Sequence, residues 1–121
     1  MKYLIVFFGS GVGGVLRYTV SLFVFKILPA FFPFGTLIVN FIGSVILGFV
    51  IYGLADRELI NTNVKILLGV GFCGGFTTFS TFSFETMNLL KDSQFLFAGL
   101  NILGNVFISL LGVYFAYILS R

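Results

Sequence analysis

Long apolar stretches separated by short polar segments dominate the sequence. Three stretches carry no charged residue at all: 27–55, 66–84 and 93–120. A fourth, residues 3–25, is interrupted by Arg17 alone. A helix needs about 20 apolar residues to cross the hydrocarbon core of a bilayer. The pattern therefore predicts an all-α membrane protein with four transmembrane helices, over residues 3–25, 34–55, 65–90 and 95–119.

Polar and helix-breaking residues mark the connections between these spans. Pro29 and Pro33 separate the first two spans, because proline cannot continue a helix. The polar segment 55–63 follows the second span, and residues 91–94 follow the third. No internal repeat divides the chain, so we expect a single four-helix domain over residues 1–121.

The composition agrees with this class and excludes several functions. Hydrophobic residues make up 59% and charged residues 9%, with a mean hydropathy of +1.14, far from the values of soluble domains. The chain has no histidine and one cysteine, Cys73, so it offers no internal disulfide and no metal-ligand or acid/base cluster. We expect no enzyme, and we interpret Cys73 as a packing residue.

One segment of the third span departs from the apolar pattern. Residues 71–85, GFCGGFTTFSTFSFE, interleave hydroxyl side chains with phenylalanines, glycines and one glutamate. Gly74 and Gly75, followed by Thr77 and Thr78, can interrupt a helix at mid-membrane, which would leave the third helix broken near Gly74 to Thr78. A break frees main-chain groups that can hold ions. The alternative is a kink satisfied by the threonine hydroxyls alone, which these residues favour when they are taken without any family comparison.

Small residues recur four positions apart in the spans. Gly9 and Gly13 form one such pair, and Gly71 and Gly75 form another. Helices in lipid associate where small residues let their backbones approach closely. These pairs therefore predict a tightly packed bundle.

Polar residues form two rows at helical spacing: Thr36, Asn40 and Ser44 in the second span, and Asn101, Asn105 and Ser109 in the fourth. Either row alone can serve interhelical hydrogen bonding. Two rows facing a hydroxyl-rich third span indicate a polar path. The path carries no carboxylate before Glu85, which favours an anion over a cation. Phe79 and Phe82 lie on roughly one face and can turn their electropositive ring edges toward such an anion.

The basic residues barely distinguish the two sides of the membrane. One side carries Lys2, Arg57, Lys65 and Arg121, and the other carries Lys26 and Lys91, with Arg17 near it. Excess Lys and Arg marks the cytoplasmic side, so the bias is weak. The chain inserts either in one orientation or in both, in which case inverted copies can pair.

Three motifs together carry a resemblance to a known family. The segments GVGGVLRY (11–18), GTLIVNFIGSVILG (35–48) and the 71–85 run resemble the Fluc or CrcB family of small bacterial fluoride channels, and the resemblance extends over all four spans. It implies an antiparallel, dual-topology homodimer in the cell (inner) membrane. The dimer would contain two narrow pores through which cytoplasmic fluoride leaves passively.

The resemblance also implies roles for individual residues. The implied fluoride pathway consists of Asn40, Phe79, Ser80, Thr81, Phe82 and Ser109. Gly74 and Thr77 match positions whose main-chain carbonyls, one pair from each subunit, hold a structural Na⁺ at the dimer centre. Arg17 matches the family arginine, which either anchors the dimer and raises the potential of an anion vestibule or extends to the membrane interface. Glu85 matches the family acid after the run, in the vestibule or in packing.

Some positions depart from the family pattern. Ser10 and Gly14 replace a glycine and an alanine in the first-span motif, and both remain small enough for close packing. Asn101 and Asn105 stand where the family has variable polar residues, so their part in the pathway is open.

Two other classes compete with the channel. A proton-coupled small multidrug antiporter shares the length, the four helices and the dual topology. It needs a titratable carboxylate deep in the bundle, and the first span has none. A purely structural subunit without transport activity would not explain the polar rows or the helix break. We therefore favour the fluoride channel.

Overall fold

The computed structural model describes all residues, 1–121, as helices and connections without strands. Four helices are long and apolar enough to cross a membrane: Lys2–Ile27, Phe34–Ala55, Thr62–Lys91 and Phe95–Leu119. The prediction of an all-α protein with four such helices is confirmed. The division into a single domain stays a prediction.

The outer spans are single α-helices, α1 (Lys2–Ile27) and α6 (Phe95–Leu119). The second span consists of α2 (Phe34–Gly48) and a π-helical segment, η1 (Phe49–Ala55). The third consists of α3 (Thr62–Lys65), the π-helical η2 (Ile66–Cys73), α4 (Gly74–Phe76) and α5 (Ser80–Lys91). In a π-helix the main chain bonds five residues back instead of four, and the hydrophobic pattern carries no signal for that change.

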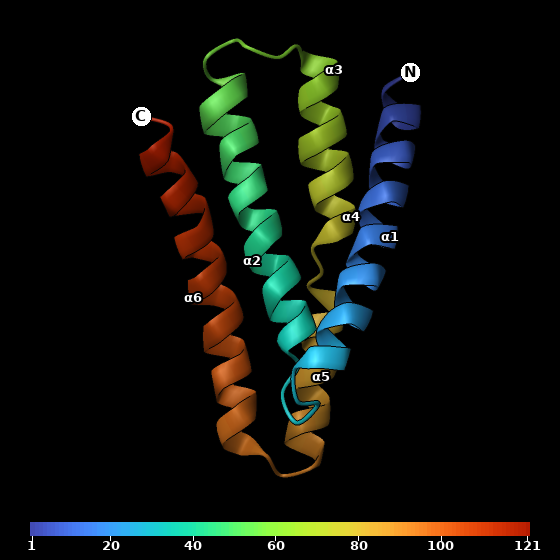
Figure 1. Ribbon diagram of the computed structural model, residues 1–121, viewed down its shortest axis with the longest axis vertical. Coiled ribbons are helices and arrows are strands. Elements are labelled where there is room, and N and C mark those ends of the chain that lie inside the picture. Colours follow the sequence, from blue (N-terminus) through green and yellow to red (C-terminus); the bar gives the residue numbers. More distant parts are fainter.

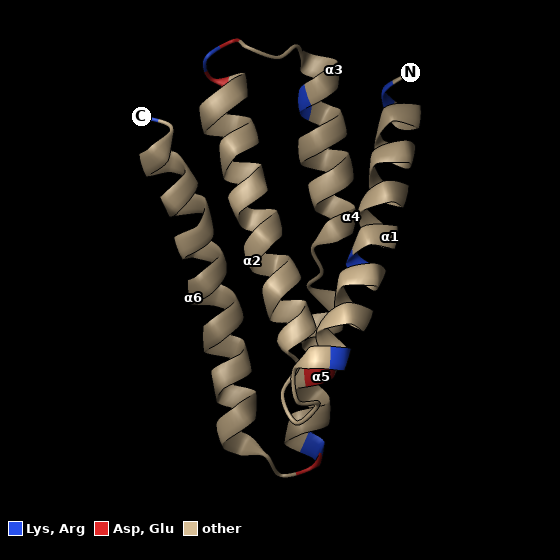
Figure 2. Ribbon diagram, in the orientation of Figure 1, with Lys and Arg blue, Asp and Glu red and all other residues tan.

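The helices form two neighbouring pairs. Figure 1 shows α1 running beside η2 and α4, and α2 running beside α6. Both chain ends and the connection from η1 to α3 lie at one end of the bundle, and the other two connections lie at the opposite end. Most charged residues lie toward these two ends (Figure 2); Arg17, partway along α1, and Glu85, within α5, lie farther inside the spans.

Glycines bring α1 and the third span into backbone contact. A Cβ atom added to Gly9 would lie 2.7 Å from a carbonyl oxygen of η2. One added to Gly13 would overlap the main chain of η2, and one added to Gly75 would overlap the main chain of Ser10. The prediction of close packing at these small-residue pairs is confirmed.

The second pair of helices packs in the same manner. Gly48, the last residue of α2, faces Ala116 of α6. Gly112 of α6 lies against the main chain of Phe41 in α2. Only 20 of the 121 residues are buried, so most large apolar side chains point outward. In a bilayer these side chains contact lipid or another protein.

The third span is interrupted at residues 77–79, where Thr77 adopts an extended conformation (φ −90°, ψ 162°). The predicted break near Gly74 to Thr78 therefore exists, but it begins after the glycines. Gly74 keeps helical angles (φ −62°, ψ −38°). Gly75 must remain in the helix because it packs on α1. The Thr77 hydroxyl donates to the Cys73 carbonyl at 2.8 Å, which helps to end the helix one turn later.

Candidate ion pathway

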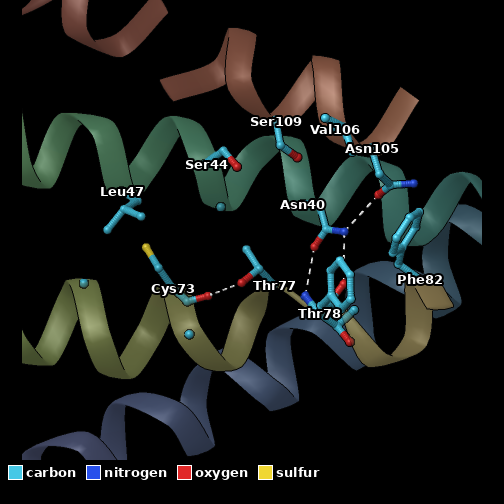
Figure 3. Close-up of a pocket in the computed structure, with 14 residues that line it drawn as sticks. Asn40, Ser44, Leu47, Cys73, Thr77, Thr78, Phe82, Asn105, Val106 and Ser109 are labelled. Atoms are coloured by element: carbon cyan, nitrogen blue, oxygen red, sulfur yellow. Dashed lines mark hydrogen bonds between the residues drawn. The ribbon is translucent and has the colours of Figure 1, made fainter. Parts of the chain in front are cut away.

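A groove of about 370 Å³ lies between the two helix pairs, next to the break (Figure 3). Its lining contains no charged residue. The groove is lined by Asn40, Gly43, Ser44, Leu47, Gly69, Cys73, Gly74, Thr77, Thr78, Phe79, Phe82, Asn105, Val106 and Ser109. An ion in this groove would meet only dipoles, ring edges and main-chain groups.

Four of the six predicted pathway residues line the groove: Asn40, Phe79, Phe82 and Ser109. Thr81 instead lines a second cavity together with Arg17 and Glu85. Ser80 borders neither, and its hydroxyl lies 3.3 Å from the hydroxyl of Thr78. The predicted pathway residues are thus divided between two cavities that flank the break, and their assignment to a pathway stays a prediction.

Phe79 and Phe82 form a ring pair at the groove. Their centroids are 5.3 Å apart and the planes are tilted by 54°, within the range of favourable aromatic contacts. Phe82 is 8% exposed, whereas Phe79 is 77% exposed. The inner ring is held by the bundle, and the outer ring has no partner beyond Phe82 in this chain.

The side chain of Asn40 clamps the break. Its Oδ1 accepts from the Thr78 N–H at 2.8 Å, and its Nδ2 donates to the Thr78 carbonyl at 3.1 Å (Figure 3). A carboxamide has one acceptor and one donor group, like the peptide groups that it replaces. Since lipid cannot satisfy main-chain polar groups, this contact lets the chain leave the helix at mid-span. The Thr78 hydroxyl completes the turn by accepting from the Thr81 N–H at 3.0 Å.

Asn40 is the first member of a hydrogen-bonded series, the amide relay, formed by Asn40, Asn105, Asn101 and Thr86. Asn40 Nδ2 donates to Asn105 Oδ1 at 2.9 Å, and Asn105 Nδ2 donates to the Oδ1 and the carbonyl of Asn101 at 2.9 Å each. Asn101 Nδ2 donates to the Thr86 hydroxyl at 2.9 Å, which donates to the Phe82 carbonyl at 2.8 Å.

Sequence reasoning left the part played by Asn101 and Asn105 open, and the structure connects both to the break. Their spacing of four residues was the available signal. The relay also uses both Nδ2 hydrogens of Asn40, one for Thr78 and one for Asn105. Asn40 therefore borders the groove with its donors already occupied.

The second cavity, of about 520 Å³, lies at the end of the bundle where α1 connects to α2. We call it the charged cavity, because Arg17, Glu85 and Asp92 line it. Arg17 Nε donates to the Gly75 carbonyl at 3.1 Å, so this arginine also secures the end of α4 against α1. Glu85 is half-buried, and its Oε1 has no hydrogen-bond partner.

Two main-chain carbonyls at the break are free. No hydrogen bond ends on the carbonyl oxygens of Gly74 or Thr77. The space beside Gly74 is open, with no atom within 4 Å of an added Cβ. Carbonyl oxygens are suitable ligands for a hard cation, but two are too few to replace its hydration shell. The pair fits part of a cation site and needs ligands from outside this chain.

Comparison of the sequence with known proteins identifies the family of this chain. A family model described as CrcB-like protein, Camphor Resistance (CrcB), matches residues 4–117. A protein named Fluoride-specific ion channel FluC from Pyrococcus abyssi is 43% identical over 121 residues, covering 98% of this chain and 94% of the relative. A protein of the same name from Shewanella sp. (strain W3-18-1) is 46% identical over 111 residues, covering 92% and 89%. The chain is thus a multi-pass membrane protein that belongs to the CrcB-like family.

Proposed function

We propose that the protein is a passive, fluoride-selective channel that exports cytoplasmic fluoride. The observation that carries the proposal is the likeness, over 98% of the chain, to a relative named as a fluoride-specific ion channel. The groove supports it chemically, because its lining is uncharged and includes an aromatic pair. Its function is transport and not catalysis.

The groove can favour a small anion without holding it tightly. Ring edges of Phe79 and Phe82 carry partial positive charge, and the Ser109 hydroxyl can donate a hydrogen bond. A full positive charge would bind the anion too strongly for rapid passage, since conduction needs binding sites that release the ion. Beyond the break, Ser80 and Thr81 continue the path toward the charged cavity, where Arg17 raises the local concentration of anions.

We propose that the functional unit is an antiparallel homodimer with two pores. The groove is open on one side, and the Phe79 ring and Gly74 are exposed there. A second, inverted copy would close the groove and cover both. The nearly equal numbers of basic residues at the two ends of the bundle support insertion in both orientations.

We further propose that a structural Na⁺ lies at the centre of this dimer. The free carbonyls of Gly74 and Thr77 from two copies would together offer four oxygen ligands. Bound there, Na⁺ would supply a fixed positive charge that holds the two breaks together. Because the site would lie between subunits, the ion should exchange slowly and should not compete with transported fluoride.

The direct test of the channel uses purified protein in liposomes loaded with potassium fluoride. With valinomycin present to carry K⁺, a fluoride electrode should record rapid efflux, whereas the same vesicles loaded with chloride should lose little. Uptake of a cationic dye driven by a proton gradient, with no fluoride efflux, would contradict the channel and support the antiporter. That alternative is not favoured, because the similar proteins are named as fluoride channels and the first span carries no carboxylate.

The dimer has a separate test. C-terminal reporters specific for each side of the membrane should both be active, in comparable amounts. A single orientation would exclude the antiparallel dimer and the symmetric Na⁺ site while leaving the fluoride measurement unaffected.

A further inference from the structure

The amide relay begins and ends on the same segment of the chain. At one end, Asn40 holds both main-chain groups of Thr78, the residue before Phe79. At the other end, Thr86 donates to the carbonyl of Phe82 itself. The relay therefore fixes the main chain on either side of the aromatic pair, and it does so through α2 and α6, which belong to the other helix pair.

The relay also has a single direction. The Thr86 hydroxyl gives its proton to the Phe82 carbonyl, so it can only accept from Asn101. Asn101 must then present Oδ1 to Asn105, and Asn105 must present its own Oδ1 to Asn40. If the Asn40 carboxamide were flipped, its oxygen would face the Thr78 carbonyl and Asn105 Oδ1, and its amide would face the Thr78 N–H. The two main-chain groups of Thr78 and the Asn105 Oδ1 thus all favour the same orientation of the Asn40 carboxamide.

Burial of the two asparagines makes a change of this arrangement energetically costly. Asn101 is 0% exposed, so it cannot exchange its partners for water, and Asn105 is only 6% exposed where it borders the groove. A buried polar group that loses its partner bears the full cost of desolvation. Neither side chain offers a donor to an ion in the groove, because the Asn105 amide donates to Asn101 and Asn101 is fully buried away from the groove.

We propose that Asn101 and Asn105 are positioning residues of the ion pathway. They anchor the carboxamide of Asn40, already oriented by Thr78, to α6, and through Thr86 they anchor the carbonyl of Phe82. In this way they hold the ring pair of Phe79 and Phe82 in one geometry without contacting the ion. The role in transport rests on the proposed fluoride channel, whereas the positioning itself does not.

The test compares three variants of the full-length protein. Asn105→Leu replaces the central amide with an apolar side chain of similar size. Thr86→Val removes only the hydroxyl at the far end of the relay, so it tests the relay even if Asn105→Leu fails to assemble. Thr19→Val is the matched control, since Thr19 bonds only to Val15 within its own helix, at 2.9 Å, and is exposed.

Each variant is measured in two independent ways. Fluoride efflux from liposomes gives the transport rate. Nuclear magnetic resonance gives the structural signal, through the Thr78 amide in protein labelled with ¹⁵N-threonine and through 4-fluorophenylalanine placed at position 79. The resonance measurements need no fluoride transport, so they test the positioning even if the wild-type protein moves no fluoride.

In Asn105→Leu, the resonance of the Thr78 amide should shift, and this amide should exchange faster with solvent. The fluorine resonance at position 79 should broaden. Fluoride efflux should fall roughly tenfold, as expected when a buried polar group loses its partner. Thr86→Val should change the same signals less, and Thr19→Val should leave them unchanged. Loss of efflux with unaltered signals would mean that Asn105 acts on the ion directly, which overturns the proposal. Altered signals with normal efflux would also overturn it, as would normal behaviour of both relay variants.

Discussion

The two cavities that flank the break differ in chemistry. The groove has no charged lining, and its amides are occupied by hydrogen bonds within the bundle. The charged cavity contains Arg17, Glu85 and Asp92, and one oxygen of Glu85 has no partner. One cavity is bordered by uncharged groups and the other by charges.

This difference predicts two kinds of influence on an anion. Dipoles and ring edges act only at contact distance, so the groove can distinguish ions by size and hydration. Charges act over a Debye length, which falls from about 30 Å at 0.01 M salt to about 10 Å at 0.1 M. The charged cavity should therefore change how often an anion arrives, and salt should weaken that effect. Ionic strength separates the two cavities experimentally.

The largest effect is expected for Asn40→Asp. The new carboxylate would face the Thr78 carbonyl and Asn105 Oδ1 where the amide now donates. It would also place a negative charge beside the groove, where repulsion is poorly screened. Fluoride efflux from liposomes should fall to background at every salt concentration. Near-normal efflux would show that the path does not pass Asn40.

Replacement of the ring pair should have the next largest effect. Phe79→Ile and Phe82→Ile keep apolar bulk but remove the electropositive ring edge. Each should lower efflux by roughly tenfold or more, if the edge supplies a contact worth about 1.4 kcal/mol in the rate-limiting step. The reduction should not depend on salt. Because Phe82 is buried, its variant also needs a check of folding and assembly by size-exclusion chromatography, with the wild-type protein as the reference.

Phe84→Ile is the matched control for both rings. Phe84 is 66% exposed and does not line the groove, so its replacement should leave efflux near the wild-type rate. If the variants at 79 and 82 assemble and conduct normally as well, the phenylalanines serve packing alone.

A smaller, salt-dependent effect is expected at the charged cavity for Arg17→Gln. Loss of the positive charge should lower efflux by a factor of about three at 0.01 M salt, and the difference should nearly vanish at 0.3 M. Arg17→Lys keeps the charge but loses the Nε donor to Gly75, so it separates attraction from anchoring of α4. A salt-independent loss in both variants would assign Arg17 to structure only.

The smallest effect should come from Glu85→Gln, with the opposite sign. Removing a negative charge from the cavity should raise efflux by a factor of about two at low salt, because an arriving anion meets less repulsion. Measurement over the same salt series checks this value. A strong decrease would instead show that the carboxylate takes part in transport.

Sequence patterns predicted the elements better than their contacts. Four spans follow from apolar run lengths, since the bilayer sets a minimum length that any sequence must meet. The start of the break was misplaced, because Gly74 and Gly75 were interpreted as helix-weakening when backbone packing on α1 requires glycine at 75. The low helix propensity of glycine describes an isolated helix, whereas here the packing of α1 keeps Gly75 inside the helix.

The amide relay shows where sequence reasoning stopped. The spacing of Asn101 and Asn105 placed them on one helix face, but the partner of Asn40 is the main chain of Thr78, 38 residues away. No pattern within one span identifies a main-chain partner in another. The same limit applies to the free carbonyls of Gly74 and Thr77, which the resemblance named but the local sequence does not reveal.

The break also changes the direction in which side chains point before and after it. Residues 71, 75 and 79 are spaced by four, so an unbroken helix would turn Phe79 toward α1, where even a methyl group on Gly75 does not fit. The interruption at residues 77–79 removes this fixed relation between the faces of α4 and α5, and Phe79 points outward. If the main chain of α5 kept its place, deleting one residue there would shift the sequence of α5 by one position. Each side chain would then turn by about 100° around the helix axis, while the glycine contacts would stay intact. The length of this segment is therefore as constrained as its composition.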